Sequence, residues 1–240
     1  MTVDTSAPTR QWGSPHLRGH VLLFDRKASA PHSPRVGVRL LLGAAAVEVA
    51  RLAAVRWLYP GIPLTLLIPS LLVLGLLVPV IAGVAFSQLG FRRWRNWTPT
   101  EKSYFLQVIV LANVIFPLAL GARLAQPVLA ASFWTVFVPY LLFGFYQELV
   151  YRGLVQLELV RRWGAPVGII VANLVFTFGP LHWQYFGSPG SVAGPMFASI
   201  FAIGLFFGMV YRRSGNLWMV AIFHAIGNAY LVWSLGSGQG

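Results

Sequence analysis

Long apolar segments repeat along most of this 240-residue chain. A helix needs about 20 mainly apolar residues to cross a bilayer, and seven segments are long enough to do so. Their approximate ranges are 38–58, 62–88, 104–124, 130–150, 165–182, 192–211 and 216–235. The pattern predicts an all-α fold, a polytopic bundle of about seven transmembrane helices.

Composition agrees with a lipid environment. Only 10% of the residues are charged, whereas a soluble domain carries roughly 25%. Hydrophobic residues make up 57% of the chain and the mean hydropathy is +0.68, so too little polar surface is present to cover a water-soluble globule. We therefore expect an integral membrane protein with the lipid bilayer as its solvent, in the cell membrane of a prokaryote.

The first predicted span differs from the others because it contains Glu48, Arg51 and Arg56. Glu48 and Arg51 are three residues apart, so they share one face of a helix and can form an ion pair. We expect this helix to turn the pair toward protein or to tilt toward the membrane interface.

The basic residues predict which side each link lies on, because cytoplasmic links are enriched in Lys and Arg. Three links are basic, through Arg92, Arg93, Arg95 and Lys102, through Arg152, Arg161 and Arg162, and through Arg212 and Arg213. The links near 59–61 and 183–191 have no Lys or Arg, and the link near 125–129 has only Arg123 at its edge. This distribution predicts a cytoplasmic N-terminus and a C-terminus on the outside.

The net charge of +12 could also indicate a nucleic-acid partner. Such binding needs basic residues gathered on one solvated face, whereas here they fall in short clusters between apolar runs. We therefore expect no nucleic-acid partner. The chain has no cysteine, which excludes a disulfide framework and thiolate chemistry.

Three regions are expected along the chain. Residues 1–36 are polar and basic and lack the apolar core of a signal peptide, so they predict a cytoplasmic tail that is disordered in part. Residues 37–128 are expected to hold the N-terminal transmembrane helices, and residues 129–240 a core of four more. Within that core, residues 151–163 mix apolar and charged positions, which is typical of a helical continuation along the cytoplasmic interface.

Few ionisable side chains occur in the last four predicted spans. They are Glu148 and Arg152 at the end of the fourth, His182 at the end of the fifth and His224 in the seventh, with Asn228 one turn further on. An ionisable group costs about 2.5–3.5 kcal/mol inside a membrane helix, so each is a candidate functional residue. Both same-helix pairs have a spacing of four residues, which places each pair on one helix face.

A carboxylate and two imidazoles in a hydrated pocket can support hydrolysis. Glu148 would take a proton from water, one histidine would shuttle it, and Asn228 with the other histidine would donate to the developing oxyanion. If a divalent metal such as zinc is present, Glu148, His182 and His224 are its expected ligands.

Each feature also has a purely structural interpretation. Glu148 and Arg152 could be an ion pair at the membrane boundary, and His182 a helix-end residue at headgroup level. His224 and Asn228 could hydrogen-bond neighbouring helices. Polar residues at mid-membrane could also line the path of a small transporter. Their occurrence together favours chemistry.

These residues resemble the motifs of one family. Residues 147–153 (QELVYRG) resemble the Glu-Glu-x-x-x-Arg motif of the CPBP (Abi) family, which holds CAAX-processing endopeptidases and bacteriocin-processing or immunity proteins. Residues 178–182 (FGPLH) resemble its Phe-x-x-x-His motif, and residues 224–228 (HAIGN) its His-x-x-x-Asn motif. The resemblance covers about residues 130–235, with the motifs in the family's order.

The resemblance implies an intramembrane endopeptidase, of glutamic type or metal-dependent, in which a glutamate activates water with help from the two histidines and the asparagine. Its substrate would be a membrane-associated protein or peptide, expected near the cytoplasmic leaflet. Gln147 stands where the family has its first glutamate, and an amide cannot act as the base. Either Glu148, about 100° around the helix, takes this role, or the chain is a catalytically weakened relative that serves as a membrane-bound immunity or partner-binding protein.

Overall fold

The structure is a computed structural model that describes residues 14–15, 24–25, 33–59, 61–97, 99–120 and 131–236. Apart from one short strand pair, these ranges contain helices and the links between them. β1 (Ser14–Pro15) and β2 (Phe24–Asp25) pair antiparallel, with Ser14 opposite Asp25. The predicted all-α class is confirmed. The predicted tail, residues 1–36, lies almost entirely outside the described residues, so the division into three regions stays a prediction.

The described ranges contain seven α-helices. They are α1 (Pro34–Ala53), α2 (Leu64–Ala82), α3 (Pro99–Leu120), α4 (Ala131–Glu148), α5 (Leu157–Phe178), α6 (Gly190–Ser214) and α7 (Leu217–Gly236). Two π-helical segments extend α1 and α4, namely η1 (Ala54–Leu58) and η5 (Leu149–Gln156). Short 3-10 turns lie in the links, namely η2 (Phe86–Leu89), η3 (Trp94–Asn96) and η6 (Trp183–Gly187).

Four helical runs in the described part of the chain are long and apolar enough to cross a membrane, namely Leu64–Ala82, Glu101–Leu118, Trp134–Phe178 and Gly190–Ser214. The third run covers the predicted fourth and fifth spans together. α1 is absent from this set and carries Glu48 and Arg51, and the described apolar stretch of α7 is short, Leu217–Val232. The chain is therefore an integral membrane protein, and the count of seven spans stays a prediction.

The helix of the fourth predicted span continues beyond that span, as predicted for residues 151–163. α4 runs through η5 into α5, and the helical course is broken only at Gly164, whose φ of 78° suits glycine. Pro166 then lies in the first turn of the next helical stretch, a position that tolerates proline. Where the fourth span ends along this helix stays a prediction.

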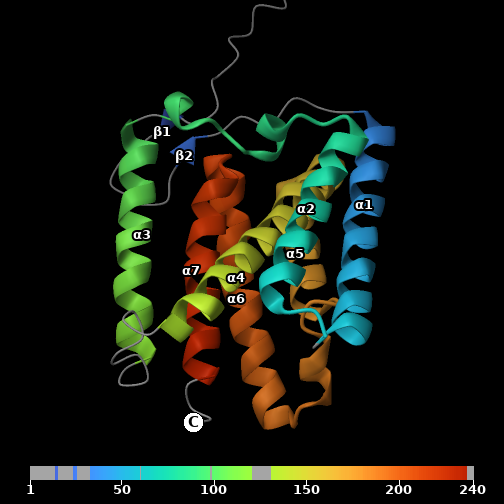
Figure 1. Cartoon of the computed structure of the whole chain (residues 1–240). Coiled ribbons are helices and arrows are strands. Elements are labelled where there is room, and N and C mark those ends of the chain that lie inside the picture. The colour runs from blue at the N-terminus through green and yellow to red at the C-terminus, as the bar shows by residue number, and fades with distance from the viewer. Residues whose placement is uncertain are drawn as a thin grey trace, which may run out of the picture.

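Figure 1 shows that the helices run alternately up and down. α4 and α7 lie at the centre and pack against each other, with α2 against α4 and α3 against α7. The first turns of α1 and α3, the α2–α3 link and the α6–α7 link lie at one end. The α1–α2 link, the α5–α6 link and the C-terminus lie at the other (Figure 1).

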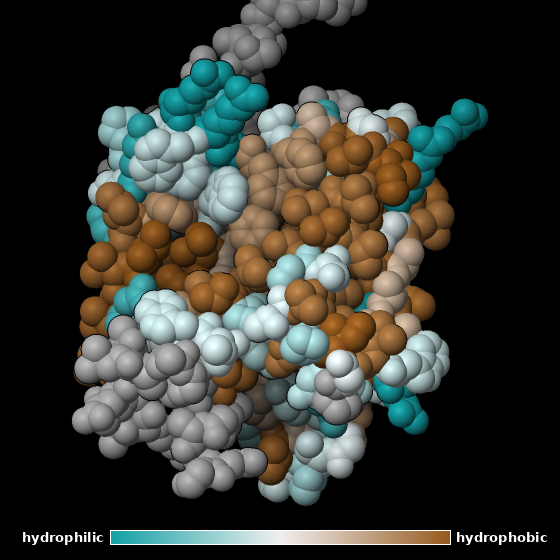
Figure 2. Space-filling model, in the orientation of Figure 1, coloured by the Kyte–Doolittle hydropathy of each residue, from teal (hydrophilic) through white to brown (hydrophobic). Residues whose placement is uncertain are grey.

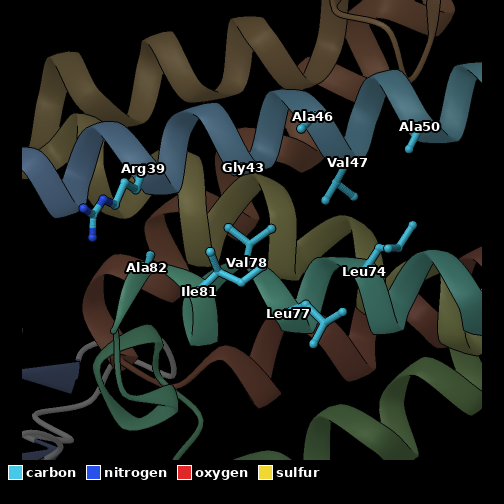
Figure 3. A pocket seen from close by; sticks show the side chains of 10 residues that line it. All are labelled: Arg39, Gly43, Ala46, Val47, Ala50, Leu74, Leu77, Val78, Ile81 and Ala82. Atoms are coloured by element: carbon cyan, nitrogen blue, oxygen red, sulfur yellow. The ribbon is translucent and has the colours of Figure 1, made fainter.

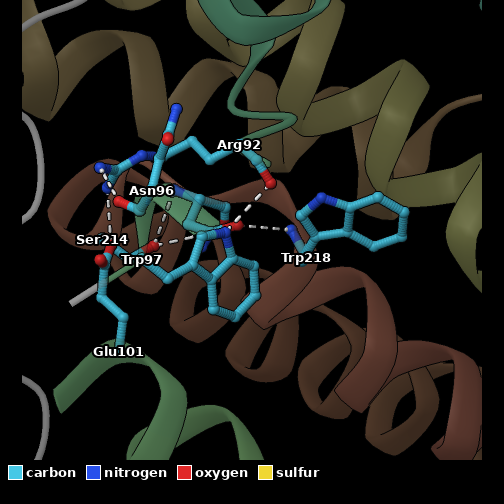
Figure 4. Close-up of polar contacts among 7 residues, drawn as sticks. Arg92, Asn96, Trp97, Glu101, Ser214 and Trp218 are labelled. Carbon is cyan, nitrogen blue, oxygen red and sulfur yellow. Dashed lines mark hydrogen bonds and ion pairs between the residues drawn. The ribbon is translucent and has the colours of Figure 1, made fainter. Parts of the chain in front are cut away.

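The end that holds the α2–α3 link is called the basic end, because it carries most of the cations that the structure describes. These are Arg35, Arg39, Arg92, Arg93, Arg95, Lys102, Arg161, Arg162, Arg212 and Arg213. Contacts around the α2–α3 link brace it. Arg92 donates to Glu101 at 2.6 Å, and Trp97 Nε1 donates to the backbone carbonyl of Arg92 at 3.0 Å (Figure 4). Leu217 N donates to Gly90 O at 3.0 Å and ties the link to α7.

Apolar side chains cover the middle of the molecule, as a bilayer requires. Figure 2 shows them as a broad brown area, with hydrophilic residues gathered above it. Leu118 and Ile81 are more than 75% exposed, which indicates contact with lipid. A groove of about 270 Å³ between α1 and α2 is also apolar along most of its length, with Arg39 near one end (Figure 3). Small residues such as Gly43 and Ala46 let these two helices approach closely.

Gly144 generates a prediction about the central packing. A Cβ at this position would lie 2.5 Å from Ala225 Cα and 2.7 Å from Ala225 N, so α4 and α7 would have to separate. We expect Gly144→Ala to destabilise the protein by about 1–3 kcal/mol, the usual cost of overpacking. Thermal unfolding in detergent measures this. Gly194→Ala is the control, because nothing lies within 4 Å of its Cβ. Equal unfolding temperatures for the two variants would contradict this close packing.

Candidate active site

Glu148 is the centre of the polar residues and is fully buried. His224 Nδ1 lies 2.7 Å from Glu148 Oε1, so the last residue of α4 meets the middle of α7. The other carboxylate oxygen, Oε2, lies 3.5 Å from Arg152 Nε without a hydrogen bond. A carboxylate in a dry interior needs such partners, because burial of an unpaired charge is costly.

Arg152 is held from two further directions. Its Nη2 donates to Gly204 O of α6 at 2.9 Å, and its guanidinium lies 4.6 Å from the ring centre of Phe176. One turn further, Gln156 Nε2 donates to Gly208 O at 2.9 Å. The segment η5 therefore docks on the backbone of α6, and this docking fixes the cation that faces Glu148.

The His224 ring lies at the boundary between dry and accessible space. Its side chain keeps 11% of its exposure, whereas that of Glu148 has none. The ring stacks on Phe207 at 5.0 Å and meets the edge of Phe176 at 6.0 Å. Since Nδ1 faces the carboxylate, Nε2 lies on the opposite edge of the ring. The imidazole therefore keeps a small exposed fraction, whereas the carboxylate has none.

Gln147 faces a different direction from its neighbour Glu148, as the turn of about 100° per residue requires. Asn228 Nδ2 donates to Gln147 Oε1 at 2.5 Å. The same two helices thus supply two adjacent contacts, one between Glu148 and His224 and one between Gln147 and Asn228. The first is buried, and the second lies on a cavity.

The cavity has a volume of about 730 Å³ and lies between α1, α4, α7 and the α5–α6 link. Its lining residues are Arg51, Leu52, Val55, Arg56, Tyr59, Tyr140, Phe143, Gln147, Leu181, His182, Trp183, Gln184, Tyr185, Asn228, Leu231 and Val232. Of the six predicted site residues, Gln147, His182 and Asn228 line it. Glu148 and Arg152 lie behind it, connected through His224.

His182 enters the cavity from the α5–α6 link. Its Nδ1 lies 2.8 Å from Phe176 O. A carbonyl oxygen can only accept, so Nδ1 carries the proton in this bond and Nε2 is the nitrogen left for another partner. The backbone of the preceding helix therefore sets the orientation of His182.

The α5–α6 link, which lines the cavity, follows a short helix. After the break at Gly164, α5 has only residues 165–178, about 21 Å of helix, whereas a hydrocarbon core is about 30 Å thick. A link that begins within the depth of the membrane is tolerated only against protein or a water-filled cavity. The polar lining residues Gln147, His182 and Asn228 suit a cavity that holds water.

An ion pair on α1 also contributes to the site, which the sequence analysis did not anticipate. Arg51 donates from Nε to Glu48 at 2.9 Å and from Nη2 to Pro180 O at 2.9 Å, two residues before His182. Tyr146 OH donates to Glu48 at 2.7 Å, next to Gln147. The predicted pairing on α1 is thus present, and a buried ion pair in a span was the signal that could have indicated a role at the site.

The predicted metal ligands are not grouped as a ready site. Within the described ranges, no three His, Asp or Glu side chains are placed to hold one metal ion. Glu148 and His224 are in contact, while His182 turns its Nδ1 to a backbone carbonyl. The metal set Glu148, His182 and His224 stays a prediction.

Residues 129–230 match a family model described as type II CAAX prenyl endopeptidase Rce1-like. The matched range contains all three motifs and the helices that carry them, and it excludes α1 with its Glu48–Arg51 pair. No curated protein and no solved structure matches the chain.

Arg152 generates a prediction about the site's stability. Arg152→Met would leave Glu148 buried beside His224 alone, and removal of one partner of a buried pair typically costs about 3–5 kcal/mol. We expect a large drop in the thermal unfolding temperature in detergent. Arg213→Met is the matched control, because Arg213 is an exposed residue at the basic end. If both variants unfolded at the wild-type temperature, Arg152 would not be the partner that stabilises the carboxylate.

Proposed function

Because residues 129–230 belong to the Rce1-like, CPBP family, we propose that this chain is an intramembrane endopeptidase that hydrolyses a peptide bond of a membrane-associated protein. The observation that carries the proposal is the 2.7 Å contact between Glu148 and His224, beside a cavity lined by other polar residues of the family motifs. We further propose that the membrane is the cell membrane of a prokaryote.

In this proposal Glu148 activates water through His224. Glu148 is fully buried, so it does not meet water itself. Its carboxylate holds the imidazole in one tautomer and stabilises the imidazolium that forms when Nε2 takes a proton from water. His224 then gives this proton to the leaving amine. Arg152 keeps the carboxylate in place from the other side.

The cavity residues act on the carbonyl that water attacks. Asn228 supplies an amide donor, which in the free protein bonds to Gln147. A substrate carbonyl would replace that acceptor as negative charge develops on its oxygen. Gln147 offers a second amide to the same space, and His182 can accept a bond through Nε2, which positions water or the peptide N–H.

A second candidate function is a membrane-bound immunity or partner-binding protein. Gln147, at the position of the family's first glutamate, favours it, together with the short bond from Asn228 that occupies an expected oxyanion donor. In that case the cavity would bind a polypeptide without cutting it.

The proposed roles of Glu148 and His224 generate a prediction about the rate of peptide cleavage. Protein in liposomes is offered a library of quenched-fluorescence peptides, with and without a chelator. We expect Glu148→Gln and His224→Asn each to lower the rate at least 100-fold, the scale of a lost general base. Gly194→Ala should keep the wild-type rate, because nothing lies within 4 Å of the added Cβ. A wild-type rate in Glu148→Gln would rule out the pair as the source of activated water. If a chelator abolished the activity of the wild type, the alternative in which Glu148, His182 and His224 bind a metal ion would be favoured.

Gln147→Glu separates the two candidate functions. If His224 supplies the base, the wild type turns substrate over and Gln147→Glu brings no gain, because the added carboxylate opposes negative charge on the carbonyl oxygen. The same assay measures both variants. If the wild type cleaved no peptide and the Gln147→Glu variant did, the chain would instead be a catalytically weakened member of the family.

A further inference from the structure

The cavity lies at the end of the bundle away from the basic end. Its outer residues come from the α1–α2 and α5–α6 links, which lie opposite the α2–α3 link (Figure 1). Tyr59 and Trp183 at this mouth are 48% and 62% exposed. Aromatic residues with polar groups are typical of the membrane interface, where such a mouth would meet water.

The path from the cavity to the basic end is filled. After Gln147 the helix continues through η5 into α5 and extends about 20 Å toward that end before it reaches Arg161. Leu149, Leu154 and Leu217, which lie on this path, are 0% exposed. Arg152 and Gln156 close it further through their bonds to α6 carbonyls. A substrate would have to displace this packed layer to enter from the basic end.

The distribution of Lys and Arg indicates which end of the bundle faces the cytoplasm. Ten described Lys and Arg residues lie at the basic end, whereas Arg51 and Arg56 are the described cations near the cavity mouth, and Arg51 is buried against Glu48. Cytoplasmic links carry the excess of Lys and Arg. The basic end therefore faces the cytoplasm, and the mouth faces the other side.

We infer that the cavity is open to the extracytoplasmic side, so that the polypeptide it takes is an extracytoplasmic segment of a membrane-anchored or exported protein. That this polypeptide is cut rests on the proposed function. The inference differs from the expectation of a substrate near the cytoplasmic leaflet, which was stated with the family resemblance. A lipidated cytosolic tail does not reach this mouth.

Cysteine accessibility tests the side directly, because the natural chain has no cysteine. Three single-cysteine variants are made, Gln184→Cys at the mouth, Asn228→Cys deep in the cavity and Arg213→Cys at the basic end. Each is exposed to a membrane-impermeant sulfonated thiol reagent in spheroplasts and in inverted vesicles. We expect the first two to react at least tenfold faster in spheroplasts, and Arg213→Cys at least tenfold faster in inverted vesicles.

Three outcomes would overturn the inference. Faster reaction of Asn228→Cys in inverted vesicles would place the entrance at the cytoplasmic side. Equal labelling rates of Asn228→Cys in spheroplasts and inverted vesicles would show that the cavity is not open to one side alone. No labelling in either preparation would show that the reagent cannot enter the cavity from water. The labelling needs no turnover, so an inactive protein labelled from outside would refute the peptidase proposal and leave the access inference standing.

Discussion

The burial of one carboxylate constrains most of the centre of this molecule. Glu148 is fully buried between lipid-facing helices, where an unpaired charge would cost several kcal/mol. It is compensated by His224 from α7 and by Arg152 one turn along its own helix. Arg152 in turn bonds to α6. One charge therefore fixes α4, α6 and α7 relative to one another, and Gly144 permits the close approach of α4 and α7 that the contact needs.

The burial of Glu148 also places the neighbouring residues Gln147 and Glu148 in different environments. Glu148 faces the dry side and contacts His224, through which we propose that it acts, whereas Gln147 faces the cavity and bonds to Asn228. The family's first motif position thus belongs to the cavity and its second to the interior. α1, outside the range that matches the family, holds the far wall through the contact of Arg51 with Pro180. α1 therefore contributes to the wall of the cavity as well as to the helix bundle.

The sequence allowed the fold class, the approximate helix ranges and the Glu48–Arg51 pair to be predicted, since each depends on local pattern. It also allowed candidate site residues to be named, but not their arrangement. The contact of Glu148 with His224 joins residues far apart in the chain, and no local pattern shows which oxygen meets which ring nitrogen. The helical continuation over 151–163 was predictable from its mixed pattern, but the break at Gly164 was not, because Gly153, the first glycine after Glu148, is equally a possible break and is instead buried in helical packing.

A double-variant cycle on the peptidase rate tests the central claim most directly. Rates in liposomes are measured for wild type, Glu148→Gln, His224→Asn and the variant that carries both changes. If the carboxylate acts through the imidazole, the two residues form one unit, and the double variant loses no more rate than the more damaging single change. Losses that multiply, so that the double variant falls by the product of the two single effects, would show that Glu148 and His224 act independently and would contradict the account.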